Sequence, residues 1–360
     1  MGIDIGTSSV KIVELASDGR RLFLSNYGQV DLGLIEEDGD ESEKNGLKKA
    51  LSPLSVDNNV EIIQTLLSEM KVKSRQCAFS IPDFSTFFTA FSLPQMTEKE
   101  LADAVLFEAR QHIPLPIESV TVDWQLVEGE IGKSEKLDLT VAAVLNEIIS
   151  QYKEIASRTK LQVVLMEAEA FGLVESLVPQ DEARPLCIVD IGAQSTVTNV
   201  VEKRVLRYSH GFDRGSNYLI SELGRRFPES RGRLRDAENK LGFKFIGLLD
   251  QEVRQKIDAI LREEFLPIFR ELEMVLSEYR RSSGKEIEKI IISGGVAAIS
   301  GVEKYFAEYF KKEIEIADPF KEFDLSDQVS HDIKDIGPAF AVAAGMARRG
   351  FEILKRQNKN

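Results

Sequence analysis

Two short segments of this sequence place an aspartate, a glycine and small polar residues in the same order. The first reads DIGTSS from Asp4 to Ser9, and the second reads DIGAQS from Asp190 to Ser195. In each, the glycine lets the backbone turn tightly and approach a ligand, and the residues after it offer backbone and side-chain donors. Donors gathered in a concave turn bind anions, so both segments are suited to phosphate.

The two aspartates add a requirement for a cation. Asp4 and Asp190 would repel a phosphate unless a positive ion lay between them. Mg²⁺ fits this role because it keeps several of its waters and takes few protein carboxylates. A single Asp-x-Gly is more often an ordinary turn, but two copies in matching contexts favour a ligand site. The sequence therefore predicts Mg²⁺ held through water by both aspartates.

Each copy lies in the same three-strand pattern. An apolar stretch precedes the Asp-x-Gly, a second apolar stretch follows it, and a polar turn leads into a third stretch at 22–28 or 204–211. Such alternation of apolar runs and turn residues is typical of β-hairpins. The repeat predicts two related half-domains that face one ligand.

Composition limits the class of protein. The chain has 360 residues, which suits two or three domains, and its 43% hydrophobic and 29% charged residues indicate a folded globular protein. The net charge of −13 argues against a nucleic-acid partner, because that binding depends on Lys and Arg. Cys77 and Cys187 lie in apolar stretches and are expected to be buried free thiols.

No segment of the sequence is typical of a membrane span or a signal peptide. Asp4 interrupts any apolar run at the start, and no apolar stretch reaches the ~20 residues that a bilayer requires. We therefore expect a cytoplasmic protein.

The stretch between the two repeats contains a compact β-α-β-β-α pattern. Its helix begins with a capping box, Thr97-x-x-Glu100, and an aromatic stretch precedes it. The aromatics suit either a core or a docking pocket; they are Phe84, Phe87, Phe88 and Phe91. Further on, Pro267 is expected to kink or break a long amphipathic helix.

Four segments together resemble the actin-like ATPase superfamily. These are the two DIG motifs, the SGG at Ser293 and the small-residue helix after Gly337. Within the superfamily the chain resembles the PilM family of type IV pilus assembly proteins, through DIGTSSVKIVEL, EARQHIPLPIESVTVDWQLVEG and EKIIISGGVAAISGVEKYF. The resemblance implies an α/β class and a duplicated actin-like (ribonuclease H-like) ATPase fold. Its two domains would surround a nucleotide cleft and carry an α+β insertion of the FtsA/PilM type.

The resemblance also implies a division of the chain. The expected parts are a first domain, 1–83; the insertion, 84–160; a connecting strand and hinge helix, 161–184; a second domain, 185–335, with a helical part at about 216–283 and the adenosine motif at 293–296; and a C-terminal hinge helix, 336–360.

Residue roles follow from the same resemblance. The expected phosphate contacts are Gly6, Thr7, Ser8 and Lys11 on one side and Gly192, Ala193, Gln194 and Ser195 on the other. The expected nucleoside contacts are Gly215, Glu238, Gly294, Gly295 and Val296. Glu169 would orient the attacking water, with Glu167 as a competitor. Leu241 and Arg214 depart from the family pattern near the ribose and the second turn.

The implied function is ATP- or ADP-dependent assembly with slow or no hydrolysis. The partner would be the N-terminal cytoplasmic peptide of a PilN-like bitopic membrane protein, which would recruit this chain to the inner face of the cytoplasmic membrane. Other platform proteins, the assembly motor ATPase and self-association are further expected contacts. Two alternatives stay open: an FtsA-like filament protein at the division site, and a small-molecule kinase of the same superfamily.

Overall fold

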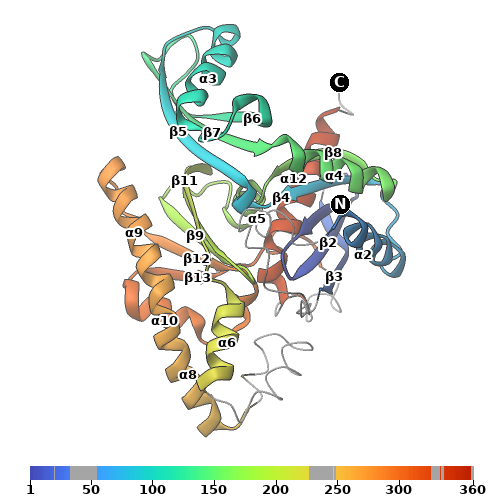
Figure 1. Ribbon diagram of the computed structural model, residues 1–360, viewed down its shortest axis with the longest axis vertical. Helices are drawn as coiled ribbons and strands as arrows, with labels where there is room; N and C mark the ends of the chain where they lie inside the picture. The colour runs from blue at the N-terminus through green and yellow to red at the C-terminus, as the bar shows by residue number, and fades with distance from the viewer. Residues whose placement is uncertain are drawn as a thin grey trace, which may run out of the picture.

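The computed structural model describes residues 1–19, 21–32, 55–226, 246, 249–325, 333 and 336–357. Two five-stranded sheets stand side by side, and a three-stranded insertion extends from the top of the first (Figure 1). The first sheet has the order β3-β2-β1-β4-β8. Its strands are β1 (Gly2–Ile5), β2 (Ser9–Ser17), β3 (Leu22–Asp31), β4 (Gln76–Ile81) and β8 (Gln162–Ala168).

The second sheet repeats this topology. Its order is β11-β10-β9-β12-β13, so each strand has a counterpart in the first sheet. Both sheets have two antiparallel pairs followed by two parallel pairs, and each outer hairpin carries a register shift. The strands are β9 (Leu186–Ile191), β10 (Thr196–Glu202), β11 (Val205–Phe212), β12 (Lys289–Ser293) and β13 (Glu313–Ile316). The duplication predicted from the two Asp-x-Gly segments is confirmed.

Two helices cross between the sheets. α5 (Glu169–Leu177) follows β8, and α12 (Ala341–Gln357) follows the short 3-10 turn Gly337–Phe340. A Cβ on Gly345 would lie only 1.8 Å from the carbonyl oxygen of Gly172, so the helices touch backbone to backbone. Small residues permit this approach, as the small-residue pattern before residue 347 suggested.

Other helices cover the outer faces. α2 (Val56–Glu69) and α4 (Asn146–Arg158) pack on the first sheet, where Tyr152 meets Phe79 edge-on at 5.6 Å. The second sheet is covered by α6 (Ser216–Arg226), α8 (Gln251–Glu264), α9 (Leu266–Ser283), the 3-10 turn Gly295–Ala298 and α10 (Val302–Phe310). The helix expected to kink or break at Pro267 is indeed divided, because Pro267 lies in the first turn of α9.

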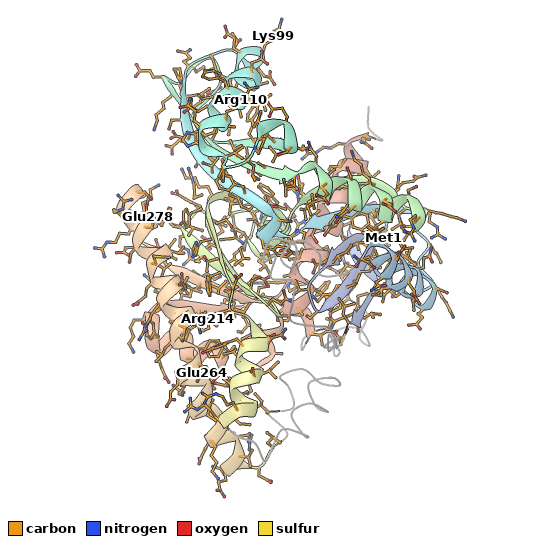
Figure 2. All side chains as sticks on the ribbon, viewed as in Figure 1. Met1, Lys99, Arg110, Arg214, Glu264 and Glu278 are labelled. Atoms are coloured by element: carbon orange, nitrogen blue, oxygen red, sulfur yellow. The ribbon has the colours of Figure 1, made fainter. Side chains whose placement is uncertain are left out.

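The insertion is a three-stranded antiparallel sheet with one helix. Its order is β5-β7-β6, which leaves β6 at an edge, and Thr97 and Glu100 form the predicted capping box of α3. Lys99 and Arg110 project from α3 at the end of the insertion far from the two sheets (Figure 2). The elements are a 3-10 turn, Asp83–Ser85; β5 (Thr86–Pro94); α3 (Glu98–His112); a second 3-10 turn, Ile117–Ser119; β6 (Val120–Glu128); and β7 (Lys136–Leu145).

The packing of α4 indicates where the insertion ends. α4 contributes Ile148 and Tyr152 to the core of the first sheet, so it favours an end near residue 145 rather than the predicted 160. The aromatic stretch is mostly core: Phe87 and Phe91 pack in the insertion, and Phe88 packs between the domains. Phe84 is instead 44% exposed.

Both cysteines are buried free thiols, as predicted, and burial raises the pKa of each to about 12. Within the described ranges, no helix combines the length and apolar character needed to cross a bilayer.

Candidate functional site

The two Asp-x-Gly segments form the same turn. Gly6 N–H donates to Ser9 O at 3.0 Å, and Gly192 N–H donates to Ser195 O at 3.0 Å. A Cβ on either glycine would come within 3.2 Å of that same carbonyl oxygen. Thr7 lies at the first turn, with Ser8 exposed beside it; Ala193 and the exposed Gln194 occupy the second. The structure thus places seven of the predicted phosphate contacts in two matching loops, and the eighth, Lys11, on β2; the seven are Gly6, Thr7, Ser8, Gly192, Ala193, Gln194 and Ser195.

The aspartates of the two turns lie close enough for their charges to interact. Asp4 is buried and accepts a hydrogen bond from Ser80 Oγ at 2.9 Å, while Lys11 Nζ lies 3.8 Å from its other oxygen. On the equivalent strand of the second half, Ser293 lies beside Asp190 and lowers its pKa, while its Oγ donates to Pro338 O at 3.2 Å. Burial raises the pKa of Asp190 to about 6, with the charge of Asp4 adding to the rise and that of Lys11 opposing it.

Glu169 joins this group from the first residue of α5. Its Oε2 accepts a hydrogen bond from the backbone N–H of Asp83 at 3.2 Å. Burial, followed by the charges of Asp4, Asp83 and Asp190, raises the pKa of Glu169 well above its usual range. Glu167, the competitor for the water-orienting role, is instead paired with Arg349 of α12, whose Nη2 donates to Oε1 at 2.6 Å.

Asp83 is a fourth carboxylate, which the sequence analysis did not identify. Its Oδ1 accepts the N–H of Ala170 at 3.1 Å, and burial raises its pKa to about 7. The neighbouring amide of Asn199 lowers that pKa, although neither Asp83 Oδ2 nor the Asn199 side chain has a hydrogen bond of good geometry. One signal was available: Asp83 directly follows a buried strand and Pro82, at the edge where the other carboxylates gather.

The residues expected at the nucleoside lie at the next strand end. Gly294 has φ +84°, and a Cβ there would be 2.3 Å from Ile191 O, so only glycine fits. A Cβ on Gly295 would meet nothing within 4 Å, which leaves open space at this position, and Val296 is buried beneath it. Glu238 and Leu241 lie outside the described residues.

Gly215 holds the start of α6 against the second turn. A Cβ there would lie 2.5 Å from Ala193 O, and Ser216 N–H donates to Gly192 O at 2.8 Å. Arg214, the departure from the family pattern, lies over the ring of Tyr218 at 4.7 Å. The substitution therefore leaves the close contact of Gly215 intact.

The donor set suits a cation held through water. Within the described parts of the chain, no three His, Cys, Asp or Glu side chains are arranged to enclose a metal directly. Asp4, Asp83, Glu169 and Asp190 nevertheless share one region with Lys11, and Asp83 Oδ2 is buried without a hydrogen bond. Excess buried negative charge of this kind is favourable only with a proton or a cation, and Mg²⁺ with its waters fits.

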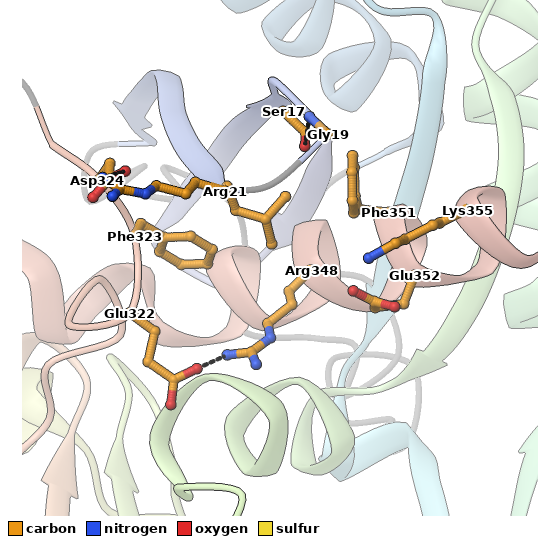
Figure 3. Close-up of a pocket in the computed structure, with 11 residues that line it drawn as sticks. Ser17, Gly19, Arg21, Glu322, Phe323, Asp324, Arg348, Phe351, Glu352 and Lys355 are labelled. Carbon is orange, nitrogen blue, oxygen red and sulfur yellow. Dashed lines mark hydrogen bonds and ion pairs between the residues drawn. The ribbon is translucent and has the colours of Figure 1, made fainter.

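A separate cavity of about 330 Å³ lies at the opposite end of β2. It is bounded by Ser17, Leu22 and the C-terminal part of α12, and Figure 3 shows Arg348 paired with Glu322 at its wall. Arg21 pairs with Asp324 beside it. Its charged groups largely satisfy one another, so this cavity is not where the predicted site residues meet.

Solved structures share the architecture. A chain of the PilM-PilN type IV pilus biogenesis complex superposes with a TM-score of 0.77 at 22% identity, covering 97% of both chains. MreB5 of Spiroplasma citri bound to AMPPNP gives 0.52 at 13% identity, covering 99% of this chain and 97% of that one. The ethanolamine utilization protein EutJ from Carboxydothermus hydrogenoformans gives 0.52 at 12%, covering 96% and 88%. These similarities confirm the actin-like fold.

The family follows from the sequence match. Residues 2–351 match the family described as type IV pilus assembly protein PilM. That range contains both phosphate turns, the insertion and the two crossing helices, which are the features that carried the resemblance. Because the match covers nearly all of the chain, the protein belongs to the PilM family of type IV pilus assembly proteins.

Proposed function

We propose that this protein binds ATP or ADP with Mg²⁺ in the cleft and docks the N-terminal cytoplasmic peptide of a PilN-like bitopic membrane protein. It would thereby serve as an assembly protein of the type IV pilus platform, cytoplasmic and recruited to the inner face of the membrane by its partner. The observation that carries the nucleotide proposal is the pair of identical turns at Gly6 and Gly192 beside the carboxylates Asp4 and Asp190.

The chain supplies distinct groups for each part of the nucleotide. Backbone donors of the two turns suit the phosphates, and Lys11 adds a positive charge beside Asp4. The open space at Gly295 and the buried Val296 suit the nucleoside. Magnesium would supply the positive charge that phosphates and carboxylates need to share one site, held through water by Asp4 and Asp190. Glu238 as a ribose contact stays a prediction.

Glu169 and its surroundings bear on the prediction of slow or absent hydrolysis. Glu169 is the candidate for orienting the attacking water, because Glu167 is committed to Arg349. The raised pKa of Glu169 keeps its carboxyl protonated more readily than an exposed one. A bound cation would return this carboxyl to its ionised form, in which it can accept a hydrogen bond from the attacking water, so slow or absent hydrolysis stays a prediction.

The partner proposal draws on the PilM-PilN complex, whose PilM chain has the same fold along its length. Extended peptides commonly bind by adding a strand to a sheet edge, and β6 offers such an edge in the insertion. Contacts with other platform proteins, with the motor ATPase and with a second copy stay predictions. The family match favours this function over the FtsA-like and kinase alternatives.

Isothermal titration tests the proposal in two steps. Mg-ATP is titrated into the full chain, and then a synthetic peptide with the N-terminal sequence of a PilN-like protein, with a scrambled peptide as control. We expect saturable binding of both ATP and the unscrambled peptide. Nucleotide binding without a peptide response would move weight to the FtsA-like alternative. Absence of nucleotide binding would leave an actin-like scaffold with a degenerate cleft.

A further inference from the structure

The root of the insertion is bonded to the hinge helix α5. Asp83 is the first residue of the turn through which the chain leaves β4, and its N–H donates to Glu169 Oε2 at 3.2 Å. In return Ala170 N–H donates to Asp83 Oδ1 at 3.1 Å. The N-cap residue of α5, Ala168, provides no side-chain cap. Asp83 therefore caps this helix from a distant part of the chain, which satisfies an otherwise free donor.

A second contact joins the insertion to α5. Phe88 of β5 meets Phe171 of α5 edge-on, with ring centroids 6.3 Å apart. The guanidinium group of Arg349, on α12, lies 5.9 Å from the centroid of the same Phe171 ring. Arg349 is also paired with Glu167. The first strand of the insertion thus rests on the helix that carries Glu169, next to the crossing of α5 and α12.

The flank of the insertion reaches the second domain. Thr140 Oγ1 of β7 donates to Leu206 O of β11 at 2.9 Å, and Arg207 lies 3.8 Å from Glu128 of β6. Figure 1 shows β5 and β7 running down towards β11 on this side. The insertion is therefore attached both to the hinge and to the domain opposite its own root, so a change in the angle between the domains must strain or release one of these contacts.

We infer that Asp83 is a positioning residue that couples the nucleotide cleft to the insertion, through its paired hydrogen bonds with Glu169 and Ala170. The inference deepens the proposed function and rests on nucleotide binding in this cleft. Asp83 lies in the same electrostatic group as Asp4 and Asp190, so a cation and phosphates arriving there act directly on the carboxylates that hold the root. If the bound nucleotide changes the affinity of the insertion for a partner, linkage requires that the partner change the affinity for nucleotide by the same factor.

Hydrogen exchange of the full chain, with and without Mg-AMPPNP, tests the coupling without an identified partner. In the wild-type protein we expect slower exchange at both phosphate turns and a change of about fivefold at residues 83–94. At a Mg-AMPPNP concentration that saturates its own phosphate turns, Asp83→Ala should lose most of the response at 83–94. Asp83→Asn keeps an oxygen for the Ala170 N–H but removes the charge on which the ligand acts, so it should restore only part of the response.

Two further variants separate coupling from simple damage to the root. Ser85→Ala removes the hydrogen bond from Ser85 Oγ to Pro82 O, in the same turn but away from α5, and should respond like the wild type. Phe88→Leu loosens the contact with Phe171 and should reduce the response partly, which keeps the inference testable if Asp83→Ala fails to fold.

The outcomes distinguish the coupling role of Asp83 from nucleotide binding itself. Protection at the wild-type turns without a change at 83–94, or an Asp83→Ala response equal to that of the wild type, would overturn the role of Asp83 and leave nucleotide binding standing. No protection at the wild-type turns would instead reject the proposed nucleotide site, and the coupling with it.

Discussion

The two halves of the molecule share one turn but differ in what stands opposite its aspartate. In the first half Asp4 pairs across the strands with Lys11, and in the second half Asp190 pairs with the buried Val197. Asp4 therefore has a cation of its own 3.8 Å away, whereas burial raises the pKa of Asp190 to about 6. The two halves therefore have the same backbone turn, but a positive side chain stands opposite the aspartate only in the first half. The second carboxylate is the one that depends on a ligand cation.

The largest expected effect comes from removing the contact that holds the halves together. In Gly345→Ala the new Cβ would lie 1.8 Å from Gly172 O, and backbone cannot yield as a side chain does. The clash should cost about 3 kcal/mol or more, well above the gain of about 1 kcal/mol from replacing glycine in a helix. Urea unfolding measures the loss. Gly295→Ala is the control, since its Cβ meets nothing within 4 Å; equal midpoints for both variants would contradict the tight crossing.

Asp190→Ala tests the half without an internal cation. Among the described residues, Lys11 is the positive charge that acts on this carboxylate, so we expect Mg-ATP affinity to fall about 30-fold or more, with little change in ATP binding when Mg²⁺ is absent. Titration calorimetry gives both values, and thermal unfolding confirms that the variant is folded. An unchanged affinity would remove the metal role from Asp190.

The sequence was most informative where the chemistry is local. Each Asp-x-Gly turn closes within a few residues, through the Gly6 and Gly192 hydrogen bonds, so its residues could be identified from spacing alone. The antiparallel hairpin pairs of the two sheets and the break at Pro267 follow from the same short-range patterns.

The parts that sequence reasoning missed arise from contacts between distant segments. Asp83 meets Ala170 across 87 positions, and Ser80 meets Asp4 across 76. The sequence around residue 83 does not indicate that α5 lacks a side-chain cap of its own and that its N-terminus lies beside Asp83. The choice between Glu167 and Glu169 likewise depends on Arg349, which lies 182 residues from Glu167.

Glu169→Ala tests the helix that crosses between the two halves, because Glu169 is the first residue of α5. Any hydrolysis should fall about tenfold or more while Mg-ATP affinity stays within about twofold, because the carboxyl would orient water rather than hold phosphate. Phosphate release under saturating ATP is the measurement. Glu167→Ala serves as the matched control; it should leave turnover similar and lower thermal stability through loss of the Arg349 pair. A fall only in Glu167→Ala would reverse the assignment.

Lys11→Val makes the first half resemble the second. The variant removes the cation beside Asp4 and a phosphate contact, so Mg-ATP affinity should fall about tenfold, close to 1.4 kcal/mol. Asp190 should also titrate at higher pH, since Lys11 now holds its pKa down. The reciprocal Val197→Lys, if it folds, should weaken the dependence of ATP binding on Mg²⁺. Equal affinities for Lys11→Val and wild type would place Lys11 outside the phosphate site.

The pH dependence of the ligand-free protein tests the same asymmetry, and its sign follows from the raised pKa values of two carboxyls. Asp190 and Asp83 have folded pKa values of about 6 and about 7, above the 3.8 of an ordinary aspartate, so between these values the folded state binds more protons than the unfolded state. Stability should therefore fall as pH rises from 5 to 8, by a few degrees in Tm. Pairs that lower a pKa, such as Glu182 with Arg184, act below this window.

Amide variants assign this slope to the two halves and to the hinge. Asp190→Asn should reduce the slope below about pH 6, and Asp83→Asn should reduce it from pH 5 to about pH 7, because each removes a group that over that range is protonated in the folded state and ionised in the unfolded state. Saturating Mg-ATP should reduce or reverse the slope, since a bound cation favours the ionised carboxylates. Differential scanning calorimetry at matched ionic strength gives the midpoints. A ligand-free Tm that rises steadily from pH 5 to 8 would mean that these carboxylates are not held above their ordinary pKa, and the asymmetry between Asp4 and Asp190 would lose its electrostatic consequence.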